Sequence, residues 1–224
     1  MFITGFPSDM TATNCWVVAA GQGEQCIIVD PGIGVLAQLD EVIAENALHP
    51  VAVFLSHGHM DHTFSVVPVC QARDVPAFIH PDDRPQLTDP WSWTGFRPGA
   101  GGPFDRFTPA EPSDLRELTD AEKVGIAGLD FTVRHAPGHT LGSVTFDITD
   151  SDGTGEQFLF SGDLLFAGSI GRVDLPGGSM SAMTESLRRV VLPLADETVV
   201  LPGHGPTTTI GRERLTNPYL LEVG

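Results

Sequence analysis

Short apolar runs of strand length recur along the chain and alternate with polar or glycine-containing segments. Runs of about four to eight apolar and β-branched residues bounded by turn residues are typical of buried β-strands. The pattern therefore predicts strands at Phe2–Phe6, Cys15–Ala20, Gln25–Val29, Val51–Leu55, Ala77–Ile79, Phe131–Val133, Val144–Ile148, Phe158–Phe160 and Thr198–Leu201.

Three of the segments between these runs favour helices. In Val35–Leu48 the apolar residues recur at helical spacing and fall roughly on one face. Ser179–Leu194 has apolar residues three and four apart, and Thr63–Ala72 follows a cluster of His and Asp. Strands interleaved with helices indicate an α/β arrangement, and 224 residues suit one domain over 1–224.

The segment 89–113 departs from this pattern because it is long, rich in Pro and Gly, and carries bulky aromatic residues. A long loop in a compact domain is usually functional or disordered, and its aromatic rings argue against disorder. Two interpretations stay open: an irregular loop held to the core by its rings, or the wall of a substrate groove formed by Trp91, Trp93 and Phe96.

The net charge of the chain and the positions of its basic residues limit the classes of function that we expect. With 29 acidic and 12 basic residues the net charge is −17, and Arg73 is the first basic residue. We therefore expect no basic leader peptide, no nucleic-acid partner and a cytoplasmic protein. No apolar run is long enough to span a membrane. The three cysteines lack C-x-x-C spacing, so we expect them to be reduced and buried.

Four of the apolar runs share a local design, since each stops, turns near a glycine and presents a metal-type ligand. Ligands in open α/β sheets bind outside the carboxyl ends of the strands, so these four ends are expected to converge. The runs lead to His57 and His59, to His139, to Asp163 and to His204.

The first cluster, His57-Gly-His-Met-Asp-His62, places three imidazoles and one carboxylate within six residues. Such donors suit Zn, Mn or Fe. Seven candidates exceed what one four-coordinate ion needs, so two metals sharing a carboxylate are expected. They are His57, His59, Asp61, His62, His139, Asp163 and His204, whereas His49, His80 and His135 are interpreted as ordinary polar residues.

At these residues the sequence resembles the metallo-β-lactamase superfamily, and within it the short bacterial glyoxalase II-like (hydroxyacylglutathione hydrolase-like) enzymes. The motifs that carry the resemblance run in order along most of the chain. They are Asp30-Pro-Gly32, His57–His62, Pro137-Gly-His-Thr140, Ser161-Gly-Asp163, Gly168–Gly178 and Pro202-Gly-His-Gly205.

The resemblance implies a four-layer αββα sandwich with a metal pair at one edge. His57, His59 and His139 would hold one metal, Asp61, His62 and His204 the other, and Asp163 would bridge. Asp30 would orient the ligand loop without binding metal. Arg172 would either pair with Asp174 or contact a substrate carboxylate.

The implied activity is thioester hydrolysis in the manner of glyoxalase II, with a metal-bridging hydroxide as nucleophile and Asp61 orienting it. Zn is the expected metal, with Fe or Mn as alternatives. A local charge near +1 at the reacting centre would admit a small anionic thioester despite the acidic chain.

The alternative functions are an iron-dependent persulfide dioxygenase using His57, His139 and Asp163, a lactonase, or a non-catalytic metal-binding scaffold. β-Lactam hydrolysis is disfavoured, because no cysteine occupies a ligand position. The oligomeric state stays undetermined.

Overall fold

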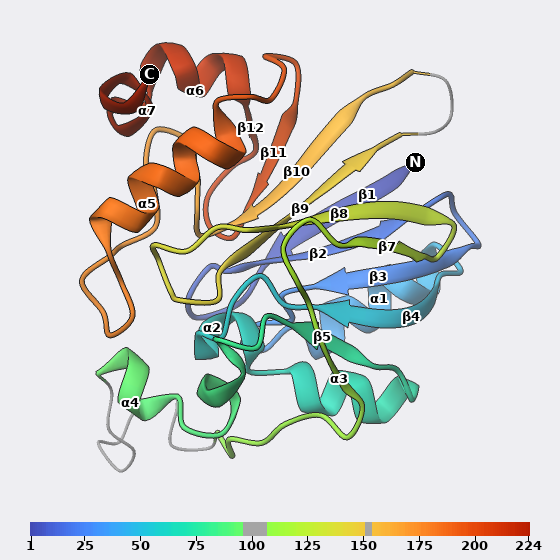
Figure 1. Ribbon diagram of the computed structural model, residues 1–224. Helices are drawn as coiled ribbons and strands as arrows, with labels where there is room; N and C mark the ends of the chain where they lie inside the picture. Colours follow the sequence, from blue (N-terminus) through green and yellow to red (C-terminus); the bar gives the residue numbers. More distant parts are fainter. Residues whose placement is uncertain (96–106, 151–153) are drawn as a thin grey trace.

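The computed structural model describes residues 1–95, 107–150 and 154–224 and contains two six-stranded sheets (Figure 1). In the first sheet the strands follow chain order, antiparallel from β1 to β3 and parallel from β3 to β6. Its strands are β1 (Phe2–Pro7), β2 (Asn14–Ala19), β3 (Gln25–Val29), β4 (His49–Phe54), β5 (Ala77–Ile79) and β6 (Leu115–Glu117).

The second sheet has the order β12-β11-β10-β9-β8-β7 and is antiparallel except where β10 pairs with β11. That parallel pair brings the carboxyl ends of β10 and β11 to the same edge. The strands are β7 (Lys123–Ile126), β8 (Leu129–His135), β9 (Val144–Thr149), β10 (Gln157–Gly162), β11 (Val199–Pro202) and β12 (Thr208–Thr209).

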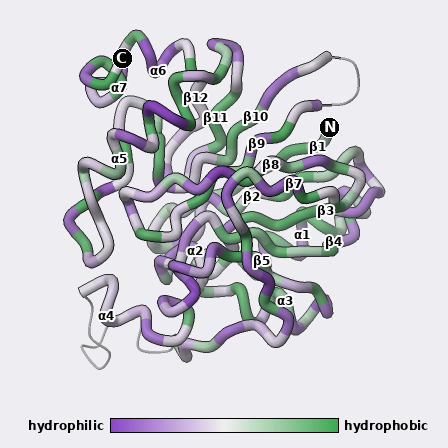
Figure 2. The backbone as a smooth tube through the Cα atoms, in the orientation of Figure 1, coloured by the Kyte–Doolittle hydropathy of each residue, from purple (hydrophilic) through white to green (hydrophobic). Residues whose placement is uncertain are grey.

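The two sheets face each other across an aromatic core. Because side chains alternate along a strand, β2 sends Trp16 and Val18 toward the second sheet and Val17 toward the helices. Between the sheets, the Phe54 ring lies 5.2 Å from that of Phe131 and 5.0 Å from that of Phe146. Figure 2 shows the apolar residues concentrated along these strands.

Helices cover the outer faces of both sheets and complete a four-layer αββα sandwich. On one side α1 and α3 pack against the first sheet, and on the other α5, α6 and α7 pack against the second. The helices are α1 (Leu36–Glu45), α2 (Met60–Thr63), α3 (Val66–Arg73), α4 (Trp91–Thr94), α5 (Met180–Ser186), α6 (Ile210–Thr216) and α7 (Pro218–Val223), with a 3-10 turn η1 (Arg84–Leu87) and a π-helical turn η3 (Leu187–Val191).

The predicted fold class is confirmed, and each predicted strand overlaps an observed one. The predicted helix 63–72 is wrong in its detail, because Phe64 and Ser65 separate α2 from α3. In the segment 89–113, a short helix α4 carries Trp91 and Trp93, whereas Phe96 lies outside the described residues. Among the described helices, none has the length and apolar character required to cross a membrane.

Candidate metal centre

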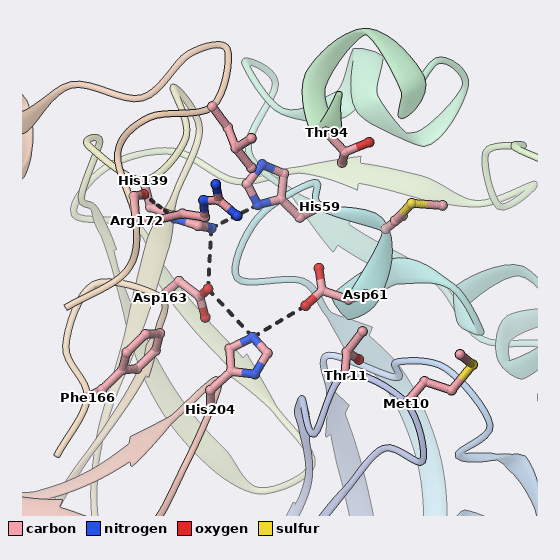
Figure 3. Close-up of a pocket in the computed structure, with 12 residues that line it drawn as sticks. Met10, Thr11, His59, Asp61, Thr94, His139, Asp163, Phe166, Arg172 and His204 are labelled. Atoms are coloured by element: carbon pink, nitrogen blue, oxygen red, sulfur yellow. Dashed lines mark hydrogen bonds and ion pairs between the residues drawn. The ribbon is translucent and has the colours of Figure 1, made fainter. Parts of the chain in front are cut away.

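The four ligand-bearing strand ends meet at one edge of the sandwich, around a cavity of about 560 Å³ (Figure 3). The chain leaves β4 to reach His57 and His59, and α2 then begins at Met60 and carries Asp61 and His62. His139 follows β8, Asp163 follows β10 and His204 follows β11. Five of the seven residues line the cavity, while His57 and His62, at 1% and 0% exposed, lie beneath it.

Close backbone packing is needed to bring the strand ends so near. At Gly203, a Cβ atom would lie 2.3 Å from Oδ1 of Asp163 and 2.7 Å from the ring of His62. Glycine is the residue that permits this approach, since it carries no side chain. The Pro-Gly-His sequence after β11 therefore places His204 beside residues from two other strand ends.

Three imidazoles form one half of the centre. Nδ1 of His59 lies 2.8 Å from Nε2 of His139, and that nitrogen lies 3.2 Å from Nε2 of His57. Nδ1 of His139 donates to the carbonyl of Arg172 at 2.7 Å, which leaves Nε2 facing the other two rings. The donor atoms of these three residues could hold one cation.

Asp61, His62 and His204 form the other half. The Nε2 atoms of His62 and His204 are 3.2 Å apart, and Oδ2 of Asp61 lies 3.3 Å from Nε2 of His204. Figure 3 shows this carboxylate and the His204 ring facing each other across the floor of the cavity. This trio could hold a second cation.

Asp163 lies between the halves. One of its carboxylate oxygens is 3.3 Å from Nε2 of His139, and the other is 3.4 Å from Nε2 of His62. Oδ1 of Asp163 and Nε2 of His59 are buried without a hydrogen-bond partner among the described residues. Buried polar atoms normally have a hydrogen-bond partner. These two unpaired atoms, one oxygen and one nitrogen, are therefore suited to bind divalent cations.

A second layer of hydrogen bonds orients the rings. Asp30 accepts from the amide and hydroxyl of Ser56, at 2.8 and 2.6 Å, and lies 3.0 Å from Nδ1 of His62. Oγ of Ser56 is in turn 3.0 Å from Nδ1 of His57. Asp30 thus orients two ligand rings so that their Nε2 atoms face the centre.

Two further residues support the site and were not predicted from the sequence. Buried Asp83 accepts from the amides of Gly58 and Gly142, at 2.8 and 2.7 Å, and from Oγ1 of Thr140 at 2.6 Å. It thereby joins the loop of His57 and His59 to the loop of His139. Oγ1 of Thr13 donates to Oδ2 of Asp61 at 3.0 Å. Asp83 follows β5, so its position after a strand end could have signalled it, whereas Thr13 has no such signal.

Burial and mutual proximity set the charges in the centre. Burial lowers the pKa of His57 and brings that of His59 to about 3, and the neighbouring histidines add to both shifts. Burial opposes a charge on His62, but Asp163 and Asp61 outweigh it and raise its pKa well above the usual range. Burial likewise disfavours the Asp163 carboxylate, yet the facing histidines hold its pKa at about 2. These shifts keep His57 and His59 as neutral imidazoles, whose lone pairs are available to a cation, beside the ionised carboxylate of Asp163.

The cavity wall differs in part from the predicted substrate contacts. Arg172 does line the cavity, and its guanidinium pairs with Asp174 through two hydrogen bonds of 2.7 Å. From α4 the lining residue is Thr94, whereas Trp91 packs edge-on against Phe107 and Trp93 lies beside Gly177. A role of either tryptophan in substrate binding stays a prediction.

Comparison with known proteins identifies the family. The model of the metallo-beta-lactamase superfamily matches residues 9–204. The hydroxyacylglutathione hydrolase GloC of Haemophilus influenzae is 33% identical over 220 residues, or 98% of each chain. Among solved structures, the BLEG-1 B3 metallo-beta-lactamase has a TM-score of 0.85 at 36% identity, over 98% of this chain and 99% of that one. TTHA1623 in a di-iron-bound form has a TM-score of 0.78 at 35% identity, over 98% and 100%. The chain is a member of the metallo-β-lactamase superfamily.

Proposed function

We propose that the protein is a binuclear metallohydrolase that cleaves thioesters in the manner of glyoxalase II. The observation that carries the proposal is the position of Asp163, within 3.4 Å of histidines from both halves of the centre. A carboxylate so placed can serve two cations at once. The substrate class is supported by the similarity to a hydroxyacylglutathione hydrolase over 98% of both chains.

In this proposal each cation would be held by the three residues of its own half, and Asp163 would serve both. With four protein ligands each, a water would enter as a fifth ligand, to which catalytic zinc sites can expand. Zn²⁺ is the expected ion. Fe is the alternative supported by TTHA1623, which has been crystallised in a di-iron-bound form. One cation is held by His57, His59 and His139, and the other by Asp61, His62 and His204.

Two divalent cations held by these residues would supply a nucleophilic water at neutral pH and an electrophile for a carbonyl oxygen. The residues of the chain then position this chemistry. Although burial opposes ionisation of Asp61, His62 and His204 hold its pKa well below the usual range. Oδ2 of Asp61 contacts Thr13 and His204, so Oδ1 would be the oxygen that orients a water.

The walls of the cavity suit a thioester. Met10, Met60, Phe166 and Leu175 give an apolar lining beside the acidic and imidazole groups. Sulfur and short acyl chains are weakly hydrated, so such a surface can exclude water around the scissile bond. Arg172 is the one arginine among the described residues that line the cavity, and it is the candidate contact for a carboxylate of an anionic thioester.

The experiment is a substrate panel with metal analysis of the same preparation. S-lactoylglutathione and acyl thioesters of other thiols are compared with the matching oxygen esters, and thiol release is followed. We expect thioester turnover that depends on bound metal. Protein that carries two cations per chain but cleaves no thioester would overturn the proposal.

The panel includes two other reactions. β-Lactam hydrolysis is the second candidate, because BLEG-1 is described as a B3 metallo-beta-lactamase and is 36% identical. A persulfide dioxygenase would use only His57, His139 and Asp163 with one iron. Oxygen uptake with glutathione persulfide by protein that carries one iron per chain would contradict the hydrolase proposal and favour the dioxygenase. β-Lactam cleavage without thioester turnover would contradict the thioester proposal and favour a β-lactamase.

A further inference from the structure

A second cluster of metal-type donors lies outside the cavity. His80 follows β5 and His135 ends β8, so these residues come from different sheets. Their imidazole rings are stacked, with centroids 4.1 Å apart and planes inclined by 4°. Asp82 lies beside them, with Oδ2 3.8 Å from Nδ1 of His80. One donor atom from each of the three residues lies within 4.8 Å of the others.

Hydrogen bonding fixes which nitrogen of His135 has a lone pair for a cation. Its Nε2 lies 2.8 Å from the carbonyl oxygen of Leu141, which accepts only if Nε2 carries the proton. The lone pair of the neutral ring is then on Nδ1. His139 in the metal centre is fixed in the same way, by a hydrogen bond from Nδ1 to the carbonyl of Arg172. Metal-binding histidines typically donate their second ring nitrogen to a carbonyl or carboxylate.

In the ring of His80, Nδ1 takes part in a long and therefore weak hydrogen bond. Nδ1 of His80 accepts from the amide of Asp82 at 3.3 Å, which is at the long end for a hydrogen bond. Burial, and next the stacked His135 ring, lower the pKa of His80, so it carries a lone pair at neutral pH. A cation can displace the long amide contact at little cost.

The surroundings favour a cation that enters from solvent. The Asp82 side chain is 56% exposed and His135 is half-buried, so the cluster is open on one side. Asp120 also lies nearby, where its carboxylate accepts from the amide of His135 and pairs with Arg189. Of Asp82 and Asp120, only Asp120 pairs with an arginine among the described residues. The carboxylate of Asp82 can therefore turn toward the rings.

We propose that His80, Asp82 and His135 form a third cation site, separate from the seven-residue centre. Two imidazoles and one carboxylate suit a borderline transition-metal ion such as Zn²⁺, with water completing the coordination. The site is weaker than the centre, because Asp82 must be ordered and the stacked rings must turn toward each other.

The test compares the Zn²⁺ content of four purified chains after equilibrium dialysis against the same excess of free Zn²⁺. They are the wild type, His135→Gln, Asp82→Asn and the control His49→Gln. Gln at position 135 keeps a donor for the Leu141 carbonyl, and His49 is an exposed histidine outside the metal-type clusters of the described residues. We expect His135→Gln to bind one Zn²⁺ per chain fewer than the wild type, Asp82→Asn to bind that ion at least tenfold more weakly, and His49→Gln to match the wild type.

Equal Zn²⁺ content in the wild type, His135→Gln and Asp82→Asn would overturn the third site. The readout is a difference of one equivalent, so it holds whether the centre binds two ions, one or none. An anomalous-scattering map of Zn²⁺-soaked crystals gives a second readout, with a peak expected between His80 and His135. Absence of that peak from crystals that show Zn²⁺ elsewhere would also contradict the site.

Discussion

At the scale of single residues, two buried carboxyl groups hold the ligand loops in place. Asp30 joins Ser56 to His62, and Asp83 joins the amides of Gly58 and Gly142. Asp30 was expected in this role from the Asp-Pro-Gly motif. Asp83 was not: its position after β5 marks it as a candidate, but its neighbour Asp82 shares that position, and only the fold shows that Asp83 is buried while Asp82 is exposed.

Replacing Asp83 by Ala should destabilise the protein and loosen both ligand loops. The change leaves the amides of Gly58 and Gly142 without their acceptor, and each buried unpaired group costs about 1–3 kcal/mol. Urea unfolding of chelator-treated protein measures the loss, with Asp82→Ala as the exposed control. Equal stability of the two variants would show that Asp83 does not brace the loops.

A methyl group at position 203 should disrupt the centre directly. The Cβ atom of Gly203→Ala would lie 2.3 Å from Oδ1 of Asp163, so the strand end or the carboxylate must move. We expect metal content and turnover to fall together. Gly21→Ala is the matched control, since the nearest atom to its added Cβ would be 3.9 Å away. Normal metal content in Gly203→Ala would contradict this geometry.

At the scale of elements, the sequence predicts the buried strands and the edge strand β1, but it misses the other three edge strands. β2 and β4 were found because their apolar runs are buried on both faces, whereas β6, β7 and β12 are short edge strands with charged or polar residues. The pattern over 63–72 suggested one helix. The chain instead breaks at Phe64 and Ser65, so Pro68 falls in the first turn of α3, where the missing amide proton is tolerated.

The carboxyl-terminal helices α6 and α7 were also not predicted, yet they support one wall of the cavity. Fully buried Glu213 on α6 accepts from the amide of Gly168 at 2.7 Å, from Oγ1 of Thr208 at 2.6 Å and from Asn217 at 2.9 Å. Nδ2 of Asn217 in turn donates to the carbonyl of Ser169 at 3.0 Å. The segment from Phe166 to Arg172 is thus tied to α6.

Glu213→Ala should therefore weaken both stability and substrate binding. The amide of Gly168 and the hydroxyl of Thr208 lose their acceptor, and each costs about 1–3 kcal/mol when it stays buried without a partner. The Tm should fall, and KM for the preferred thioester should rise more than kcat falls, because the wall moves while the ligands stay. Glu222→Ala on exposed α7 is the control. A KM unchanged in Glu213→Ala would show that α6 does not position the wall.

At the scale of the whole molecule, the chain has a net charge of −17 and contains the candidate metal centre. The sequence could predict the strands and the seven donors, since apolar runs and strand ends are local features, and the αββα layers followed from the resemblance to the family. It could not predict which remaining histidines meet. His80 and His135 are 55 positions apart in sequence and stack only because β5 and β8 lie in facing sheets.

Removing the cations should lower thermal stability as well as activity. Ions that bind only the folded chain stabilise it by mass action, and the seven donors are adjacent only after folding. Chelator-treated protein should show a lower Tm that returns when Zn²⁺ is restored. The Tm of Asp163→Ala should respond much less to Zn²⁺, and an equal response would place the stabilising ions elsewhere.

The most direct measurement of the central claim is the metal content of the wild type and of Asp163→Ala, purified and dialysed side by side. Asp163 touches both halves of the centre, so its loss should remove both cations and thioester turnover together. The account predicts two metal ions per chain fewer in Asp163→Ala than in the wild type. Equal metal content in the two proteins would contradict it.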